Sequence, residues 1–493
     1  MGSDPGEFRE KLLDIEDKSG IFELEVNGIR LWQYIRWFCL VEIMYDVTGI
    51  VGRYEKRKRV SDQDVKMGFK ERLARQQFLL SKKDLIVLNH PRRIKEGKYY
   101  RCFVTETLLE NLECSYYVFE DALCGQHFRP APTKNLKYIN TGFLRKIFVK
   151  KSENTNRQLR IFYNKLMDVF EKDNKIKLSL KVKKEILNYV ISGYYEIQCR
   201  TVWAKIVFSL VRPKALIIVA PYSPDAGAVI VEAKRRKIAT IEMQHGINND
   251  HFFYNYVYQG KVDIFPDYIF AYGECDREAK RYPIAKEKIL PVGYPDLEKK
   301  AEKYKKTKKN GQNVMLFISN SEDIIAEYAV ALRKDQRLNH IRMIYKLHPD
   351  EYGRYKSKYA QLADCGVEVI SENKHDIYYY LGQADYVVGT ESTALYEATV
   401  FGPEIYIISG GSYSLSRMLY EKGYAQLVTS ADMLADRILN PVPFAKNKES
   451  YFAKNAVENM KQELDKIMKE SDARRVRHGD KKKGSGHNSG CDR

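Results

Sequence analysis

Short apolar runs alternate with amphipathic stretches along most of the chain, and the pattern is clearest between Met343 and Ser409. Three apolar runs there have the length of buried strands, at residues 343–347, 386–388 and 404–408. Between the second and the third run, apolar residues recur at helical spacing until Gly402 and Pro403. The order strand, helix, strand predicts a parallel sheet whose strands all end at one edge.

The same alternation fills two stretches of similar size, and 493 residues are enough for two or three domains. The first stretch has expected strands at residues 84–89, 115–120, 214–220 and 238–244. The second has them at residues 268–272, 289–292, 313–319, 343–347, 367–370, 386–388 and 404–408. We predict an α/β protein with two Rossmann-like domains facing a cleft, 81–260 and 261–445. A helical N-terminal extension, 1–80, precedes them, and a C-terminal helix with a basic, disordered tail, 446–493, comes after them.

The formal net charge of +18 is concentrated in a few runs. Arg53 to Arg75 holds nine Lys or Arg residues against four acids, and Lys299 to Lys309 holds seven against one. The sequence carries no RNA-binding signature, helix-turn-helix or finger pattern, so we expect no nucleic-acid partner. Clustered Lys and Arg also suit an anionic membrane surface. We favour membrane contact for the Arg53 run and a solvated surface for the Lys299 run.

The remaining composition indicates a cytoplasmic protein. No window of about 18 residues is free of charge, as a spanning helix requires, and the N-terminus lacks the basic and apolar segments of a secretion signal. Eight cysteines are scattered without a C-x-x-C pair, which predicts neither a zinc knuckle nor a disulfide framework.

Residues capable of acid–base chemistry stand where predicted strands end. Gln244, His245 and Gly246 follow a strand of the first domain, and His348 and Pro349 follow one of the second. Open parallel sheets bind ligands beyond the carboxyl ends of their strands, and histidine accepts protons near neutral pH. One histidine at a strand end is most often a structural hydrogen-bonding residue, whereas two in different domains favour function. We predict that His245 is the general base.

The second domain also offers groups that suit a nucleotide phosphate, because a positive helix end and polar side chains follow its strands. The predicted donor-binding residues are Lys346, His348, Pro349, Thr390, Glu391, Ser392, Thr393 and Glu397, with Gln244, Gly246 and Gly389 in support. Several of these residues also have a purely structural interpretation. Lys346 could be a solvated residue at the edge of the sheet, Ser392 or Thr393 could be a helix N-cap, and Glu397 could be a surface carboxylate.

Several common chemistries lack their motifs. His348 and Glu351 lie three residues apart without a further ligand at suitable spacing, so we expect no metal. Neither a G-x-x-x-x-G-K-[ST] loop nor a G-x-G-x-x-G turn follows a predicted strand, which disfavours ATP hydrolysis and dinucleotide redox chemistry. Asp62 and Asp64 form a D-x-D pattern, but their basic, polar surroundings indicate a chance match.

The ordered motifs resemble those of bacterial surface-polysaccharide glycosyltransferases of the GT-B fold. The similar families are capsule Kdo transferases, capsular sialyltransferases and CDP-glycerol glycerophosphotransferases. The resemblance runs from about residue 84 to 409 and rests on the segments Gln244–Gly246, Pro266–Gly273, Lys346–Pro349 and Gly389–Glu397, with Phe22–Trp32 near the start. Two features depart from these relatives. The acidic pair that sialyltransferases carry before a glycine is absent from the matching place, and Glu391 stands where glycerophosphotransferases usually have Asp.

This resemblance implies a metal-independent, inverting transfer without a cofactor. The second domain would hold a nucleotide-activated sugar, with CMP-linked donors favoured, and His245 would face a lipid-linked or oligosaccharide acceptor of a capsule or lipopolysaccharide chain. The enzyme would be cytoplasmic and peripheral to the anionic inner membrane. Two alternatives stay open: a CDP-glycerol-type polyol-phosphate transferase, and a non-catalytic polysaccharide-assembly protein that keeps the fold.

Overall fold

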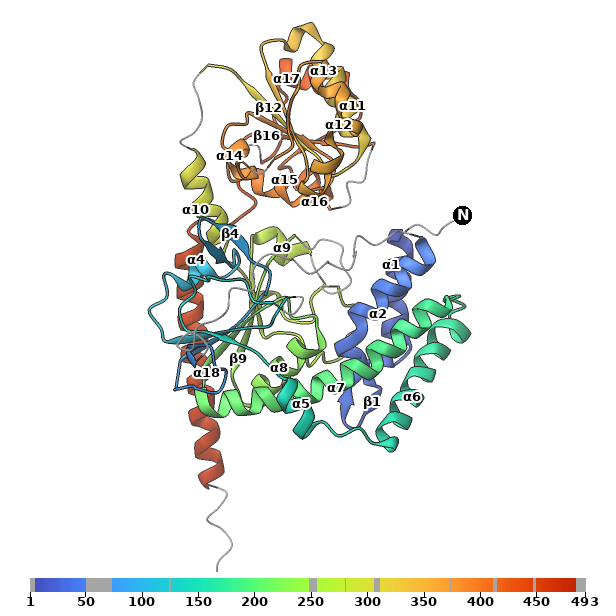
Figure 1. Ribbon diagram of the computed structural model, residues 1–493, viewed down its shortest axis with the longest axis vertical. Helices are drawn as coiled ribbons and strands as arrows, with labels where there is room; N and C mark the ends of the chain where they lie inside the picture. The colour runs from blue at the N-terminus through green and yellow to red at the C-terminus, as the bar shows by residue number, and fades with distance from the viewer. Residues whose placement is uncertain are drawn as a thin grey trace, which may run out of the picture.

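A computed structural model of the chain describes residues 5–49, 73–123, 126–247, 255–279, 281–305, 311–372, 374–410, 415–446 and 449–484. Two α/β domains lie one above the other, with a helical layer beside the lower one (Figure 1). The two predicted Rossmann-like domains are confirmed by their sheets. Most of the Arg53–Arg75 run, including Asp62 and Asp64, and the end of the tail lie outside the described residues.

The first sheet is parallel and has seven strands in the order β11-β10-β9-β8-β3-β6-β7. The strands are β3 (Leu85–Asn89), β6 (Tyr116–Glu120), β7 (Leu136–Tyr138), β8 (Ala215–Val219), β9 (Ala239–Met243), β10 (Tyr268–Ala271) and β11 (Ile289–Pro291). Alternate residues of the buried strands face different layers. One face packs on α4 (Glu106–Leu109) and α18 (Ala456–Gly484), and the other packs on α7 (Leu180–Val211) and α8 (Pro224–Arg235). The chain therefore winds around both faces of the sheet.

The second sheet is also parallel, with six strands in the order β14-β13-β12-β15-β16-β17. They are β12 (Val314–Ile318), β13 (Arg342–Lys346), β14 (Glu368–Ile370), β15 (Tyr386–Gly389), β16 (Glu404–Ile408) and β17 (Gln426–Val428). One face is covered by α11 (Asp323–Lys334), α13 (Ala360–Asp364) and α17 (Ala431–Leu439). The other is covered by α14 (Ile377–Leu381), α15 (Thr393–Ala398) and α16 (Arg417–Glu421).

Two strands assigned from the sequence to the second domain lie instead in the first sheet. These are β10 and β11, and β10 pairs in parallel with β9. Asp267 secures this pairing, because one of its carboxylate oxygens accepts hydrogen bonds from the backbone N–H and the hydroxyl of Thr240 at 3.0 and 2.8 Å. Alternation of strands and helices predicts strands, but it carries no information on which sheet a strand joins. The first sheet therefore extends to Pro291.

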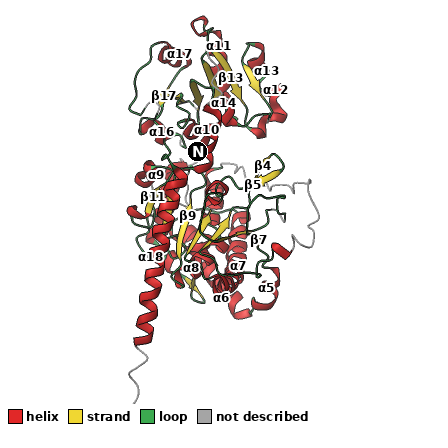
Figure 2. Cartoon of the chain, turned by 90° about the vertical axis from the view of Figure 1, so that its left-hand side faces the viewer, coloured by secondary structure: helices red, strands yellow, loops and turns green. Residues whose placement is uncertain are grey.

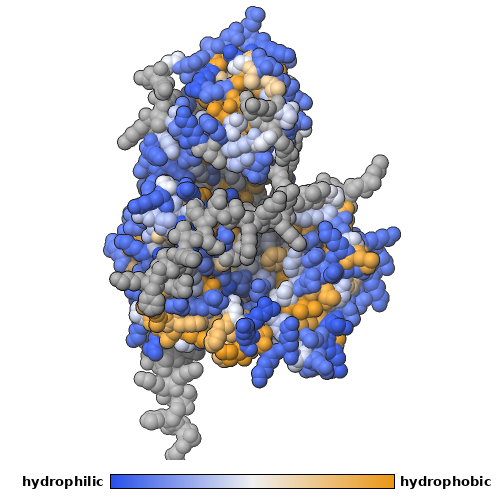
Figure 3. All heavy atoms as spheres, in the orientation of Figure 1, coloured by the Kyte–Doolittle hydropathy of each residue, from blue (hydrophilic) through white to orange (hydrophobic). Residues whose placement is uncertain are grey.

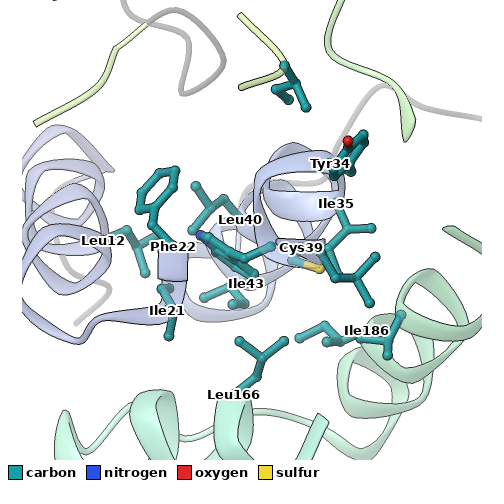
Figure 4. Close-up of a cluster of buried hydrophobic side chains, with 14 of the residues drawn as sticks. Leu12, Ile21, Phe22, Tyr34, Ile35, Cys39, Leu40, Ile43, Leu166 and Ile186 are labelled. Atoms are coloured by element: carbon teal, nitrogen blue, oxygen red, sulfur yellow. The ribbon is translucent and has the colours of Figure 1, made fainter. Parts of the chain in front are cut away.

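The N-terminal helices belong to a helical layer that the first domain completes. α1 (Pro5–Lys18) and α2 (Leu31–Thr48) share one hydrophobic cluster with α6 (Glu153–Met167) and α7, as the side chains in Figure 4 show. Inside this layer Arg36 of α2 is buried and ion-paired with Glu16 of α1, which also accepts a hydrogen bond from the Trp32 indole at 2.7 Å. Pairing compensates the charges that burial would otherwise penalise.

Two connections join the domains. α10 (Pro295–Tyr304) leads upward, and α18 returns to run along the first domain (Figure 2). Glu298 of α10 accepts hydrogen bonds from the backbone N–H groups of Asn455 and Ala456 at the start of α18, at 2.8 and 2.9 Å. Met460 and Leu464 of α18 then pack against the first sheet. In the described part of the chain, no helix combines the length and the apolar character needed to span a bilayer.

Candidate active site

Each sheet has a switch point, a place where the chain reverses the direction in which it adds strands. The switch point lies between β3 and β8 in the first sheet and between β12 and β15 in the second. Open α/β sheets bind ligands beyond the carboxyl ends of strands at such points. Ile247 and Tyr272, which follow β9 and β10, share a hydrophobic cluster with Leu395 of α15. The segments that follow β9 and β10 of the first sheet therefore pack in one cluster with the second domain.

His245 lies among aromatic residues that follow neighbouring strands of the first sheet. Its ring centroid is 6.1 Å from that of His90, which follows β3, and the two planes differ by 18°. The ring of Tyr222, which follows β8, is 6.0 Å away. Tyr222 in turn contacts Trp37 of α2, with centroids 4.7 Å apart. Three adjacent strands thus bring two histidines and a tyrosine together.

The residues flanking His245 fix the position of its loop. Gln244 is buried, and its amide donates to the carbonyl of Gly246 at 3.0 Å and to the carboxylate of Asp276 at 3.2 Å. The side-chain oxygen of Gln244 accepts from the backbone N–H of Tyr272 at 2.7 Å. Gln244 therefore links the ends of β9 and β10 and supports His245, which is itself partly exposed.

A hydrogen bond between Asn320 and Thr390 spans the switch point of the second sheet. Asn320 follows β12, and its amide donates to the hydroxyl of Thr390 at 2.7 Å. Thr390 follows β15 and is buried. The two strand ends that would contact a ligand at this point are therefore held together.

Glu351 anchors the loop that carries His348. Its buried carboxylate accepts from the Ser319 hydroxyl at 2.6 Å and from the backbone N–H of His348 at 3.2 Å. The hydroxyl of Tyr359 donates to the other carboxylate oxygen. Hydrogen bonds to a buried charged group are individually strong. They position the segment that begins at Pro349, the first residue of a short 3₁₀ helix, Pro349–Arg354.

The side chain of His348 remains accessible beside this anchored backbone. It is 48% exposed, and its Nδ1 lies 3.3 Å from a carboxylate oxygen of Asp350. The backbone N–H of Asp350 donates to the same nitrogen, also at 3.3 Å. His348 is thus oriented from one side, with a large part of its ring open to a ligand.

Lys346 is buried, so the alternative interpretation of this residue as a solvated edge residue is wrong. Its ammonium donates to the Tyr352 hydroxyl and, at 3.3 Å, to the carbonyl of Leu347. The Tyr352 ring also lies 4.7 Å from the Lys346 nitrogen. Burial lowers the pKa of Lys346 to about 8. A buried lysine held by neutral oxygens is energetically costly, and perturbed pKa values of this kind cluster at functional sites.

The loop after β15 caps the next helix. The hydroxyl of Ser392 accepts from the backbone N–H of Ala394 at 3.2 Å, so Ser392 is the N-cap of α15, as the structural interpretation states. Gly389 is the last residue of β15, and the side chain of Thr393 is exposed. Glu391 accepts from the backbone N–H of Leu415 at 2.9 Å, which ties this loop to the segment before α16.

Glu397 lies on the side of α15 that faces α10 and α14. Its carboxyl interacts with the hydroxyl of Tyr378 and with the charges of Lys300 and Asp296. Burial raises the pKa of Glu397 to about 7. These partners differ from those of Lys346 and His348, and they belong to a tyrosine-rich part of the domain junction.

The structure adds residues that the sequence pattern did not select. His90 and Tyr222 accompany His245, and Ser319 and Asn320 accompany the second-domain residues. All four follow β3, β8 or β12, so strand-end position, the signal that selected His245, also marks them. Glu351, which the sequence suggests only as a partner for a metal, is instead an anchor of the His348 loop. Throughout the described ranges, no group of three or more His, Cys, Asp or Glu residues is arranged to hold a metal ion.

Comparisons with known proteins return structures but no sequence family. No family model and no curated protein matches the sequence. Among solved structures, UDP-GlcNAc 2-epimerase from Methanocaldococcus jannaschii matches with 11% identity and a TM-score of 0.47, covering 77% of this chain and 99% of that one. The UDP-GlcNAc-bound 2-epimerase from Neisseria meningitidis matches with 13% identity and a TM-score of 0.47, covering 78% and 100%. The wall teichoic acid polymerase TagF matches with 11% identity and a TM-score of 0.42, covering 79% and 90%.

Proposed function

We propose that the protein transfers a sugar from a nucleotide-activated donor to a growing capsule or lipopolysaccharide chain. The donor binds the second domain, with CMP-linked sugars favoured over CDP- and UDP-linked ones. The acceptor, a lipid-linked or free oligosaccharide, binds the first domain near His245. The reaction is inverting, and the enzyme acts in the cytoplasm, peripheral to the inner membrane.

The observation that supports this proposal is that polar residues follow the strands at and beside the switch point of each sheet. On the second-domain side, Lys346, His348 and Asn320 supply positive charge and hydrogen-bond donors for a phosphate. Thr390 and the backbone N–H groups after β15 extend this set, so phosphate neutralisation is assigned to protein groups rather than to a divalent ion.

On the first-domain side, His245 takes the proton of the acceptor hydroxyl. The hydroxyl oxygen then attacks the anomeric carbon of the donor, and the bond between that carbon and the phosphate oxygen breaks. The nucleotide leaves with the bonding electrons, and the protonated His245 later returns its proton to solvent. The ring of His90, whose centroid lies 6.1 Å from that of His245, borders the same proposed acceptor position.

Product analysis tests the proposal against its two rivals. Purified protein is incubated with CMP-, CDP- and UDP-activated donors and an oligosaccharide acceptor, and the product is examined by mass spectrometry and NMR. We expect a new glycosidic bond with inverted anomeric configuration. A new phosphodiester would instead establish polyol-phosphate transfer. Nucleotide binding without turnover on any donor would favour the non-catalytic assembly protein.

A further inference from the structure

Three large apolar side chains are exposed on one short helix of the first domain. The helix is α5 (Gly142–Phe148), and Phe143, Ile147 and Phe148 are 66%, 47% and 55% exposed. Phe143 and Ile147 are four residues apart and share one face of the helix. Leu144 points the other way and packs in the core beside Trp203 of α7. The helix is therefore anchored to the domain while its outer face stays apolar.

Positive charge surrounds these apolar side chains. Between Lys134 and Lys151 the chain has six Lys or Arg residues and no Asp or Glu. Arg145, Lys146 and Lys150 are exposed. Among the residues that the structure describes, no carboxylate forms an ion pair within 4 Å with these three cations, although the charge of Arg145 acts on Glu196 of α7. We name Phe143, Ile147 and Phe148 with these three cations the α5 patch.

The α5 patch lies beside the point where the Arg53–Arg75 run joins the domain. The end of this run and the segment after it lie along the edge strand β7, since the Lys137 ammonium donates to the carbonyls of Ala74 and Leu79 at 2.9 and 3.1 Å. Gln77 donates to the carbonyl of Asn140 at 2.6 Å, two residues before α5. Figure 3 shows hydrophobic side chains gathered on the lower part of this face, in the region where Figure 1 places α5.

We propose that the α5 patch inserts into the headgroup region of an anionic lipid bilayer. Aromatic and aliphatic side chains ringed by Lys and Arg are the composition of helices that lie in a membrane interface. A second copy of this chain is a poorer occupant, because a twofold contact would bring the same cations together in a protein of net charge +18. An anionic bilayer offers an apolar environment to the apolar side chains of the α5 patch and negatively charged headgroups to its cations.

This inference rests on the proposed function, because a lipid-linked acceptor would bring the enzyme to a membrane. Vesicle binding is measured without donor or acceptor, so its result is independent of whether the protein transfers a sugar. The full chain is sedimented with phosphatidylcholine vesicles that contain or lack phosphatidylglycerol. We expect binding only to the anionic vesicles, weakening with added salt. The triple variant Phe143→Ser, Ile147→Ser, Phe148→Ser and the single variant Lys146→Glu are compared with the wild type.

The triple variant should bind at least about 10-fold more weakly, because it loses the apolar contact. Lys146→Glu should bind roughly fivefold more weakly or worse, since each basic residue near an anionic surface contributes about that factor. Val442→Ser and Lys334→Glu, exposed positions of the second domain, are the matched controls and should bind normally. Charge reversal of Arg57, Lys58 and Arg59 tests the neighbouring run and should also weaken binding.

Two results would overturn the role of the α5 patch. One is vesicle binding by the triple variant that equals that of the wild type. The membrane contact would then be the Arg53–Arg75 run if charge reversal in that run weakens binding, and neither of the two regions if it does not. The other is a wild-type protein that does not bind anionic vesicles and sediments as a dimer in ultracentrifugation, while the triple variant sediments as a monomer. That result would make the α5 patch an interface between copies.

Discussion

Replacement of His245 by alanine should lower turnover by about 10²–10⁴-fold, the usual contribution of a general base. The affinity for nucleotide should stay nearly unchanged, because His245 follows a strand of the first domain, where its ring neighbours include His90 and Tyr222, and the donor is proposed to bind the second domain. Initial rates with saturating donor measure the first effect, and calorimetric titration of nucleotide measures the second.

Two other histidines serve as comparisons. His340 is exposed on the second domain, so His340→Ala should retain wild-type turnover and affinity. His90→Ala should lower turnover less than His245→Ala, since His90 acts on the base only as a neighbour. The assignment of the base to His245 fails if His245→Ala remains active, or if His90→Ala shows the larger loss.

Lys346→Met should change stability and binding in opposite directions. The buried ammonium of Lys346 is held by neutral oxygens, and burial lowers its pKa to about 8. Methionine of similar length removes that cost, so the free energy of unfolding at pH 7 should rise by about 1–3 kcal/mol. The same change removes a cation from the proposed phosphate site, and nucleotide affinity should fall by about 10-fold.

The pH dependence of both quantities distinguishes this role from a merely structural one. Between pH 8 and the ordinary lysine pKa of 10.5, the unfolded chain binds more protons than the folded protein at this residue. Wild-type stability should therefore gain a contribution as pH rises through this window, and Lys346→Met should lack it. Nucleotide affinity of the wild type should decline above pH 8 as Lys346 loses its proton. Equal affinities for wild type and variant at pH 7 would remove Lys346 from the donor site.

The strand-end positions of the candidate residues could be predicted from the sequence because they depend on local order. Apolar runs that stop at His245 and His348 predict strands, and parallel strands place the residues after their carboxyl ends at one edge of the sheet. Sheet membership was not readable in the same way. β10 joins the first sheet through the contact of Asp267 with Thr240, which lie 27 residues apart, and periodicity does not encode such pairings.

The interaction partners of the candidate residues could not be predicted from the sequence either. The sequence left open that Lys346 is a solvated edge residue, yet its side chain is buried and its ammonium donates to the Tyr352 hydroxyl. Glu351 looked like an incomplete metal ligand but binds Ser319, 32 residues away. Glu397 is one turn from Ser392 in the chain, and its carboxyl interacts with Tyr378 of α14 rather than with the loop before its own helix. In each case a contact distant in sequence decides what the side chain can do.

The most direct test of a nucleotide-activated donor in the second domain is calorimetric titration of CMP, CDP and UDP in the presence of EDTA. The wild type should bind at least one of these nucleotides without metal, with CMP preferred. His348→Ala should bind at least about 10-fold more weakly, because a charge-assisted hydrogen bond contributes about 1.5–3 kcal/mol. Preference for CDP would favour the polyol-phosphate rival. Binding that requires Mg²⁺ or Mn²⁺, or an affinity indifferent to His348, would contradict the account.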